Sequence, residues 1–375
     1  MPPAARRPIV SAGVDAAALR AEFPVLAERA YLNAGSCGPL PKAAHDAAAE
    51  LLDEATAQGR TYPYFMAMLD LRERQRAAYA ERLRADPADV ALTTCTSDGI
   101  VRVLAGLDLR PGDEVLTAPD EHPGLLGPLV TLRERRGIVV RTAPFAELAD
   151  AVDGRTKLVA CSHVSWVTGA VRPPGLAELD GIPVLLDGAQ GVGAVPADVN
   201  ALGCAFYAGA GQKWLCGPVG SGMLWISPAS RDRLSEVGAT YGNLVEPGAG
   251  LRSPVWPDAR RHDAPAISPE TCAAAIAAHD VLAKAGWDAV HERAARLAAS
   301  LADRLGASGR TVAPRGTTTL VSWEDPDPEA TRDRLAEEGI VIRNLPGTPY
   351  LRASVGAWND EDDLERLCAA LAPAV

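Results

Sequence analysis

The feature that most constrains the fold is a regular alternation of short apolar runs with helical patterns between about residues 40 and 230. This alternation is typical of a parallel β-sheet wrapped by helices, because each parallel connection needs a crossover helix. The candidate strands are Val90–Thr94, Glu114–Thr117, Ile138–Thr142, Lys157–Cys161, Val184–Leu186, Ala205–Tyr207 and Met223–Ile226. We therefore expect an α/β domain built on a mostly parallel seven-stranded sheet.

Polar residues follow several of these runs. Gly, Ser, Asp or His stands where a longer apolar element would continue. Ligands of open parallel sheets bind just beyond the carboxyl ends of the strands. The pattern predicts a functional site at that edge.

The alternation of apolar runs and helical patterns ends at about residue 229. A stretch rich in Gly, Pro and Arg runs to about residue 268 and is too irregular for a core element. Helices and strands then alternate in a pattern that predicts a small α+β domain: Thr271–Leu305 helical, Thr317–Trp323 a strand, Pro328–Glu338 a helix, Val341–Arg343 and Leu351–Val355 strands, and a closing helix capped near Asn359. We expect an N-terminal segment (1–30) packed near the small domain, a large domain (31–262) and a small domain (263–375).

Composition excludes several classes of function. The 375 residues carry a formal net charge of -11 with no cluster of Lys or Arg, which disfavours nucleic-acid binding and favours a small-molecule substrate. No apolar run is long enough for a signal peptide or a membrane span, so we expect a cytoplasmic protein. Neither the seven cysteines nor the six histidines show ligand spacing, so we expect no metal site.

Two polar residues carry the strongest chemical signal. Asp187 ends an apolar strand, where a buried carboxylate needs a cationic partner. Lys213 lies between Gly-Ala-Gly and Trp214-Leu215, where partial desolvation would free its amine as a nucleophile. A lysine to form an imine and a carboxylate to face a pyridinium nitrogen are the minimum that pyridoxal phosphate (PLP) chemistry needs. From chemistry alone, a surface lysine and a helix-capping aspartate remain an equal alternative.

A nucleotide-binding alternative fails on spacing. A P-loop needs GxxxxGK[ST], but Gln212 precedes the lysine and Trp214 follows it. The GAQGVG segment comes too late in the chain for a dinucleotide fold, which places its glycines after the first strand.

Seven segments in order resemble the class V aminotransferase family of fold-type I PLP enzymes, which holds cysteine desulfurases, cysteine C-S lyases and isopenicillin N epimerases. They are YLNAGSCGPLP, TTCTSDGI, DEHPG, SHVSWVTGAVRP, DGAQG, GQKWLCGPVGSG and YLRASVGAWNDEDDLERL. The resemblance implies the fold-type I architecture, a large PLP-binding domain with a small C-terminal domain, and PLP as the cofactor.

The resemblance also assigns roles on the cofactor side. Lys213 and Asp187 would be catalytic, Gln190 would hydrogen-bond the ring's phenolic oxygen, and His122 would stack on the ring and move protons. For His122 the alternative is a capping or core histidine. The cofactor phosphate would lie at a helix N-terminus beside Thr96 and Ser97, with Gln212 also contributing, although Ser97 would make a good N-cap with or without phosphate.

On the substrate side, Arg352 in YLRAS would receive the α-carboxylate, a task for which a planar guanidinium is suited. Arg343 is a second candidate, and Asn33 and Trp166 would line the same pocket. The family's fold type implies a homodimer with shared active sites, completed in part by the connection around Arg260–Ser268.

The chain departs from the family in places. Desulfurases carry a cysteine on a loop before the substrate arginine, and EEGIVIRNLPGTPYLR has none, so only Cys37 in GSCGP remains as a distant candidate. Ala210-Gly211-Gln212 replaces the common Ser-Gly-His before the lysine. We expect C-S lyase or desulfurase-like chemistry on a cysteine-type substrate, with an epimerase or a class V aminotransferase as the alternative and a non-catalytic PLP-binding scaffold as a remote one.

Overall fold

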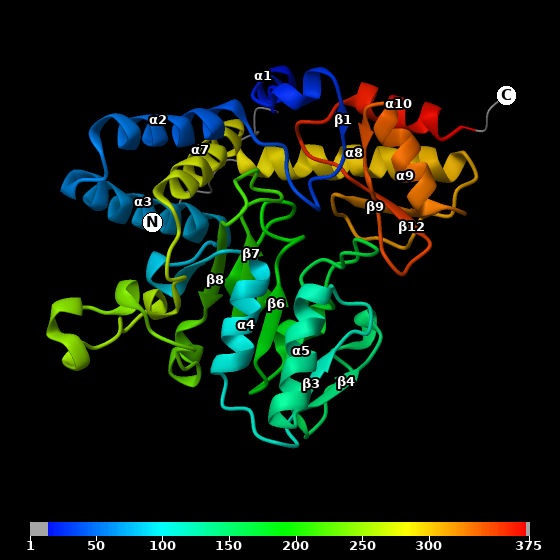
Figure 1. Ribbon diagram of the computed structural model, residues 1–375. Helices are drawn as coiled ribbons and strands as arrows, with labels where there is room; N and C mark the ends of the chain where they lie inside the picture. The colour runs from blue at the N-terminus through cyan, green and yellow to red at the C-terminus, as the bar shows by residue number, and fades with distance from the viewer. Residues whose placement is uncertain (1–13, 373–375) are drawn as a thin grey trace, which may run out of the picture.

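The computed structural model describes residues 14–372. A seven-stranded sheet forms its centre, made of β2 (Val90–Thr93), β3 (Glu114–Thr117), β4 (Val139–Thr142), β5 (Thr156–Ser162), β6 (Val184–Asp187), β7 (Phe206–Ala210) and β8 (Gly222–Ile226). The strand order is β2-β8-β7-β6-β5-β3-β4 (Figure 1). Strands β7, β6, β5, β3 and β4 are parallel, and β8 is antiparallel to both of its neighbours. The expected mostly parallel seven-stranded sheet is confirmed.

Strand β7 extends three residues further than the sequence predicts. The Ala-Gly-Ala after Tyr207 was expected to leave the sheet, but it continues the pairing with β8 up to Ala210. Small residues are needed there, because a Cβ at Gly99 of the overlying helix would lie 3.0 Å from the Ala208 Cβ. The glycine and alanine content therefore reflects close helix packing rather than a loop.

Both faces of the central strands β6, β7 and β8 are buried, which explains why these strands are mostly apolar, whereas the edge strand β4 is partly exposed and includes Arg141. Consecutive side chains of a strand point to opposite faces of the sheet. Val115 and Leu185 therefore pack in the apolar cluster on one face, and Leu116 and Leu186 pack in the cluster on the other. Helices α4 (Thr96–Gly106) and α5 (Pro123–Arg136) cover the first face, in front of the strands in Figure 1. Helix α3 (Tyr62–Leu83) contributes Tyr79 to the second.

The C-terminal part follows the expected succession of helices and strands, except that the expected strand Val341–Arg343 is wrong: β10 and β11 lie on either side of Ile342 and belong to different sheets. It consists of α7 (Pro269–Ala285), α8 (Trp287–Ala307), β9 (Leu320–Glu324), α9 (Pro328–Glu337), β10 (Ile340–Val341), β11 (Arg343–Asn344), β12 (Tyr350–Ser354) and α10 (Glu361–Ala370). Strands β11, β12 and β9 form an antiparallel sheet over its own apolar cluster. The helical region breaks at Gly286, whose φ of 84° is a conformation that glycine adopts easily.

The N-terminal part reaches across to these elements. It contains α1 (Ala16–Ala21), β1 (Ala30–Tyr31) and α2 (Lys42–Gln58). A short helix of the large sheet region, α6, spans Val199–Leu202 between β6 and β7. Strand β1 pairs with β10, and Arg20 forms ion pairs with Asp360 and Asp363 at the start of α10. Residues 1–13 of the predicted 1–30 segment lie outside the described residues. The boundary at 262/263 stays a prediction, since α7 also packs against α2 and α3.

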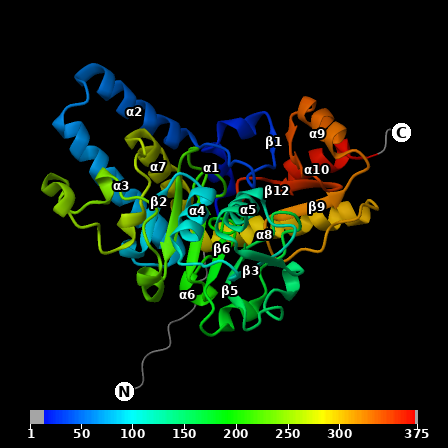
Figure 2. The ribbon, with the colours of Figure 1, turned by 60° about the horizontal axis from the view of Figure 1, so that its bottom comes forward.

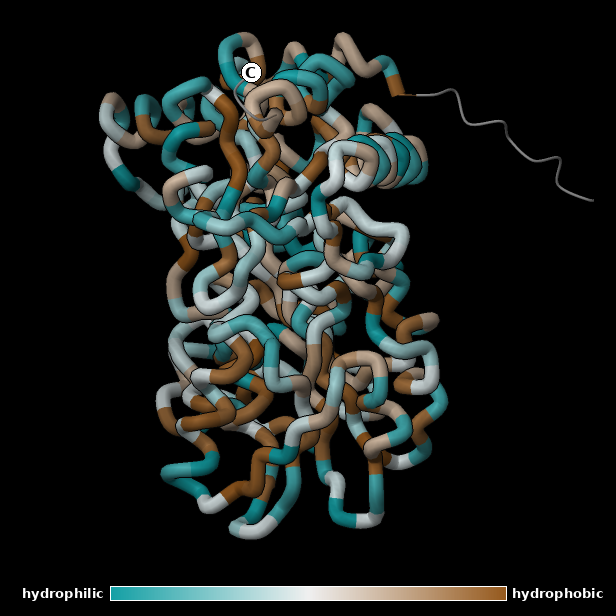
Figure 3. The backbone as a smooth tube through the Cα atoms, turned by 90° about the vertical axis from the view of Figure 1, so that its right-hand side faces the viewer, coloured by the Kyte–Doolittle hydropathy of each residue, from teal (hydrophilic) through white to brown (hydrophobic). Residues whose placement is uncertain are grey.

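Figure 2 shows α2 and α3 on one side of the molecule and α9 and α10 on the opposite side. Hydrophobic and hydrophilic stretches alternate along the described chain throughout (Figure 3). Within residues 14–372, no helix combines the length and the apolar character that a membrane crossing requires. The same residues contain no cluster of three or more His, Cys, Asp or Glu side chains placed to hold a metal ion.

Candidate active site

Loops at the carboxyl ends of the parallel strands carry four residues selected from the sequence. Strand β3 leads to His122, β5 leads to Trp166, β6 ends in Asp187 and β7 leads to Lys213. Because β3, β5, β6 and β7 are successive parallel neighbours, these loops open onto one edge of the sheet. The structure therefore brings the four residues to the same edge.

Lys213 lies in the turn after β7 with its side chain partly buried. Burial lowers the pKa of its amine to about 8; the charge of Asp187 opposes this shift, and the charges of Arg352 and Arg343 add to it. The backbone at Lys213 is crowded, since a Cβ at Gly38 would lie 2.0 Å from the Lys213 carbonyl oxygen. The lowered pKa makes the free amine, which is the nucleophilic form, accessible near neutral pH.

Asp187 is 5% exposed and has few interactions of its own. Its carboxylate accepts one hydrogen bond, from the Ala189 N–H at 2.9 Å, and forms no ion pair within 4 Å in the described part of the chain. Burial raises the pKa of this carboxyl, while the charge of Lys213 lowers it. A buried carboxylate with so little compensation is suited to a cationic ligand group.

Glu121 is a candidate that the sequence reasoning missed. Its buried carboxylate accepts hydrogen bonds from the Ser162 N–H, at 2.8 Å, and from the Ser162 hydroxyl. Ser162 is paired in register with Asp187, so two buried carboxyl groups lie close together. Burial raises the pKa of Glu121 to about 8; the hydrogen bonds from Ser162 oppose this shift and the charge of Asp187 adds to it. The only signal in the sequence is an acidic residue between a buried strand and His122.

His122 is the N-cap residue of α5. Its Nδ1 accepts a hydrogen bond from the Gly124 N–H at 3.0 Å, and its ring lies edge-on to Trp166 with 5.1 Å between ring centroids. Burial lowers the pKa of His122 to about 4, and the charges of Lys213, Arg343 and Arg352 add to this. The imidazole is therefore neutral at neutral pH, with its proton on Nε2.

The start of α4 differs in one detail from the expectation. The N-cap is Cys95, whose Sγ accepts from the Asp98 N–H at 3.4 Å, so the expectation that Ser97 caps this helix is wrong. Cys95 has the extended backbone that a cap requires, whereas Ser97 is already helical. Thr96 is buried, and its hydroxyl has no hydrogen-bond partner among the described residues.

The three remaining amide side chains occupy different positions at this edge. Gln190 is buried, donates to the Gly35 carbonyl at 2.8 Å and accepts from Trp214 Nε1 at 2.9 Å, which leaves one amide N–H free. Gln212 Oε1 and Asn33 Oδ1 are buried atoms without a hydrogen-bond partner in residues 14–372.

Arg352 on β12 is 1% exposed and stands opposite Arg343 of β11. Its Nη1 donates to the Trp166 carbonyl at 2.7 Å, but Nε has no partner and no carboxylate lies within 4 Å among the described side chains. Burial lowers the pKa of Arg352 to about 9, and the charge of Arg343 lowers it further. Arg343 itself donates to the Ser36 hydroxyl at 3.1 Å. A buried guanidinium without a counter-ion is suited to an anionic ligand.

Gly35, in the loop after β1, lies between β12, which carries Arg352, and the loop after β6, which carries Gln190. A Cβ there would lie 2.8 Å from Arg352 Nη2, 3.0 Å from Gln190 Oε1 and 2.7 Å from Ser354 Oγ. Any larger residue would displace a side chain, so β12 and the loop after β6 approach each other only across a glycine. The Arg352 guanidinium is thereby held beside the edge that carries Asp187 and Lys213.

The chain is similar in sequence to known proteins. The family model described as aminotransferase class-V matches residues 30–367. A probable cysteine desulfurase of Pseudomonas aeruginosa is 34% identical over 337 residues, covering 80% of this chain and 81% of that protein. An isopenicillin N epimerase of Streptomyces clavuligerus is 28% identical and covers 91% and 93%.

Two solved structures are also similar to this chain in fold and sequence. A C-DES mutant with glycine covalently linked to its PLP cofactor has a TM-score of 0.89 and 27% identity, covering 94% of this chain and 99% of that one. The complex of the cystine C-S lyase C-DES with its reaction product, cysteine persulfide, has a TM-score of 0.88 at the same identity and coverage. The chain therefore belongs to the class-V aminotransferase family and is a PLP-dependent enzyme.

Proposed function

We propose that this enzyme cleaves the carbon–sulfur bond of a cysteine-type amino acid by removing its α-proton and eliminating the sulfur. The observation that carries the proposal is Arg352, a buried guanidinium without a carboxylate partner in the described chain, beside the edge that bears Lys213 and Asp187. An amino-acid carboxylate would supply the missing counter-charge in a bidentate pair. The similarity to a cystine C-S lyase supports the choice of substrate class.

The residues present fit the cofactor. Lys213 Nζ would hold it covalently, and the Asp187 carboxylate, which has one hydrogen bond, would face its ring nitrogen. The N-terminus of α4, with the unpartnered hydroxyl of Thr96, suits the phosphate. When bound, PLP supplies an electron sink for the negative charge left at the substrate's α-carbon.

The chain's own residues divide the remaining work. Arg352 would bind the substrate carboxylate, and Arg343 would add positive charge beside it. Lys213 Nζ would take the α-proton, since its lowered pKa makes the free amine available. His122 Nδ1 already accepts from the backbone, so its Nε2–H would donate a hydrogen bond to the departing sulfur, and the proton that Lys213 Nζ has taken would pass to that sulfur.

The segment before Arg352 favours elimination over transfer of sulfur to an enzyme thiol. Residues 338–351 contain no cysteine, and β10, β11 and the start of β12 tie parts of this segment into strand pairing. Cys37 is exposed on the loop beside Lys213 and remains the nearest alternative acceptor.

An amino-acid epimerase is the second candidate, and the isopenicillin N epimerase match over 91% of this chain favours it. Both reactions begin with loss of the α-proton, and they differ in whether sulfur leaves or a proton returns on the other face.

A product screen tests the proposal. The PLP-loaded protein is incubated with cystine, cysteine and alanine, while sulfide and persulfide, pyruvate, keto acids and D-amino acids are followed together. We expect pyruvate and reduced sulfur from cystine or cysteine, and no products from Lys213→Ala. D-Amino acids without pyruvate would replace the proposal with epimerisation, and a holoenzyme that exchanges no α-proton in D₂O would exclude both.

A homodimer with shared active sites is part of the same proposal. Large apolar side chains are exposed on α2, α3 and the connection after β8, namely Leu52, Tyr62, Met66, Leu69, Tyr241 and Leu251. Leu69 and Tyr241 line the same surface pocket, and contiguous exposed apolar side chains are typical of an interface. Sedimentation equilibrium is expected to give twice the chain mass of 39.2 kDa, and a monomer would contradict this part of the proposal.

A further inference from the structure

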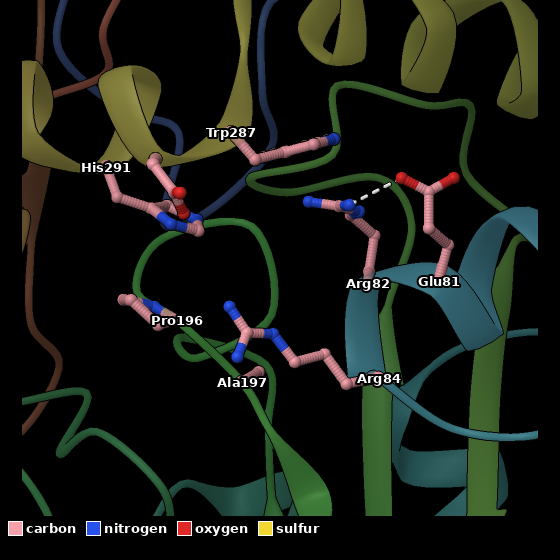
Figure 4. Close-up of a pocket in the computed structure, with 8 residues that line it drawn as sticks. Glu81, Arg82, Arg84, Pro196, Ala197, Trp287 and His291 are labelled. Carbon is pink, nitrogen blue, oxygen red and sulfur yellow. Dashed lines mark hydrogen bonds and ion pairs between the residues drawn. The ribbon is translucent and has the colours of Figure 1, made fainter. Parts of the chain in front are cut away.

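A second cavity, away from the candidate active site, lies where α3 ends, α8 begins and the loop after β6 passes between them (Figure 4). Its volume is about 290 Å³, and its walls include Arg82, Arg84, Pro196, Trp287 and His291. In Figure 4 the guanidinium groups of both arginines and the ring of His291 point toward one another across the cavity.

An aromatic ladder forms one wall. Trp287, the first residue of α8, lies between the rings of His279 and His291 at centroid distances of 5.8 Å each. The Arg82 guanidinium stacks on the Trp287 ring at 4.3 Å from its centroid. Such stacking holds the guanidinium in place, so its donors are organised before any ligand arrives.

Several buried polar atoms of this cluster have no hydrogen-bond partner among the described residues: Arg82 Nε, His279 Nε2, Trp287 Nε1 and both ring nitrogens of His291. Trp287 is 8% exposed and His279 is 4% exposed. Most buried polar atoms in native proteins are satisfied, so a concentration of unpartnered ones indicates a place where something polar binds. The candidate active site shows the same property.

The unpartnered groups are mainly donors. Tryptophan and arginine N–H groups can only donate, and burial lowers the pKa of His291 to about 4, so that its ring is neutral with one donor. Two carboxylates also line the cavity: Glu81 accepts from Arg82 Nη2 at 2.6 Å, and Asp288 is exposed at the rim. The unpartnered Arg82 Nε and Trp287 Nε1 can only donate, whereas the second ring nitrogen of a neutral His291 can accept.

Arg84 adds an independent observation. It ends α3 with a φ of 53°, a left-handed conformation that glycine adopts at far lower cost. Its side chain reaches the cavity, and its nearest carboxylate, Asp198, is 3.6 Å away. Strain retained at one residue is a reason to look for a role of its side chain.

We propose that this cavity is a binding site for the oxyanion of a small molecule, a carboxylate or a phosphate, held by Arg82 and Arg84. The loop after β6, which lines this cavity at Pro196 and Ala197, also approaches the segment that follows Lys213. Gly193 of that loop is so close to the segment after Lys213 that a Cβ would lie 2.9 Å from the Trp214 carbonyl carbon.

The test is calorimetric titration of the PLP-loaded enzyme with inorganic phosphate and with succinate, at ionic strength held constant with chloride. We expect saturable binding of at least one of the two, and the one that binds identifies the source of the oxyanion. Arg84→Gln is expected to weaken this binding by about tenfold or more, because it removes a charged donor.

Two controls locate the binding. Arg110→Gln removes an exposed arginine remote from the cavity in sequence and is expected to bind like the parent protein. Arg352→Gln removes the proposed substrate arginine and is also expected to keep this binding. Absence of saturable binding, or binding that Arg352→Gln abolishes and Arg84→Gln leaves intact, would overturn the proposal.

Discussion

Two buried arginines differ in whether a carboxylate of the described chain neutralises their charge, and this difference separates a structural role from a functional one. Arg76 on α3 is 2% exposed and Arg352 on β12 is 1% exposed, so both guanidinium groups have left bulk water. Arg76 donates to both carboxylate oxygens of Asp263, at 3.0 and 2.8 Å, and to the Val90 carbonyl at 2.7 Å. Arg352 donates to one carbonyl and meets no carboxylate in the described chain. The two guanidinium groups are equally buried, but among the described residues only Arg76 has a carboxylate partner for its charge.

The pKa values follow this difference. Burial lowers the pKa of Arg76, but the hydrogen bonds and charge of Asp263 more than offset it, so the pKa of Arg76 is raised overall. Burial lowers the pKa of Arg352 to about 9, because no anion stabilises its charge. The first pair joins α3, β2 and the connection after β8 into one body. The second group gains its counter-charge only when a ligand arrives.

The largest expected effect concerns the compensated pair. Asp263→Asn leaves the Arg76 charge buried without its partner, which is expected to lower the free energy of unfolding by about 3–5 kcal/mol. Chemical denaturation measures this change. The matched control is Asp108→Asn, an exposed carboxylate 3.4 Å from Arg110, for which about 1 kcal/mol or less is expected. If the two variants had the same free energy of unfolding, the buried Arg76–Asp263 pair would contribute no more to stability than the exposed Arg110–Asp108 pair.

The uncompensated arginine is expected to behave in the opposite way. Arg352→Gln should lower kcat/KM by roughly 100-fold or more, about 3 kcal/mol, for whichever substrate the product screen identifies. Its free energy of unfolding should change by less than about 1 kcal/mol or rise, since a buried charge without a partner has been removed. Arg352→Lys keeps the charge and loses the planar fork, so it should recover only part of the activity. A large loss of stability without loss of activity would reverse the comparison.

The sequence predicts those parts of the molecule that local pattern encodes. All seven sheet strands were located, the central ones because burial on both faces leaves apolar runs and the edge strand β4 from its β-branched residues Val139, Val140 and Thr142. The end of β7 and the cap of α4 were placed wrongly. The Ala-Gly-Ala of β7 has the composition of a loop, and cysteine is an uncommon cap compared with the nearby Ser97.

For the site, the motifs around Lys213, Asp187 and Arg352 were sufficient to select residues that the fold brings to one region. Glu121 was missed because its significance depends on a contact with Ser162 across two strands, which no local pattern encodes. The cavity at Arg82 and Trp287 was missed for the same reason, since these residues come from distant helices.

Glu121 is a third buried charge-bearing group and extends the comparison to acids. Its pKa is raised from 4.5 to about 8, so the native state keeps a proton that the unfolded chain loses between these values. The free energy of unfolding should therefore fall as the pH rises from about 4.5 to 8, by at most about 1.4 kcal/mol per pH unit. Glu121→Gln should remove this slope and keep the hydrogen bond from the Ser162 N–H. Denaturation at a series of pH values checks this, and parallel curves for the two proteins would contradict it.

The smallest effect links Arg352 to Lys213. Because the free amine is the reactive form, capture of PLP by the apoprotein should speed up about tenfold per pH unit below pH 8 and level off above it. The charge of Arg352 contributes to lowering the pKa of Lys213, so Arg352→Gln should move this midpoint to higher pH. Stopped-flow absorbance measures the rate, with Arg110→Gln as the control whose midpoint stays in place. If the Arg352→Gln midpoint did not move, the charge of Arg352 would act on the substrate alone, and the lowered pKa of Lys213 would follow from burial without help from its neighbour.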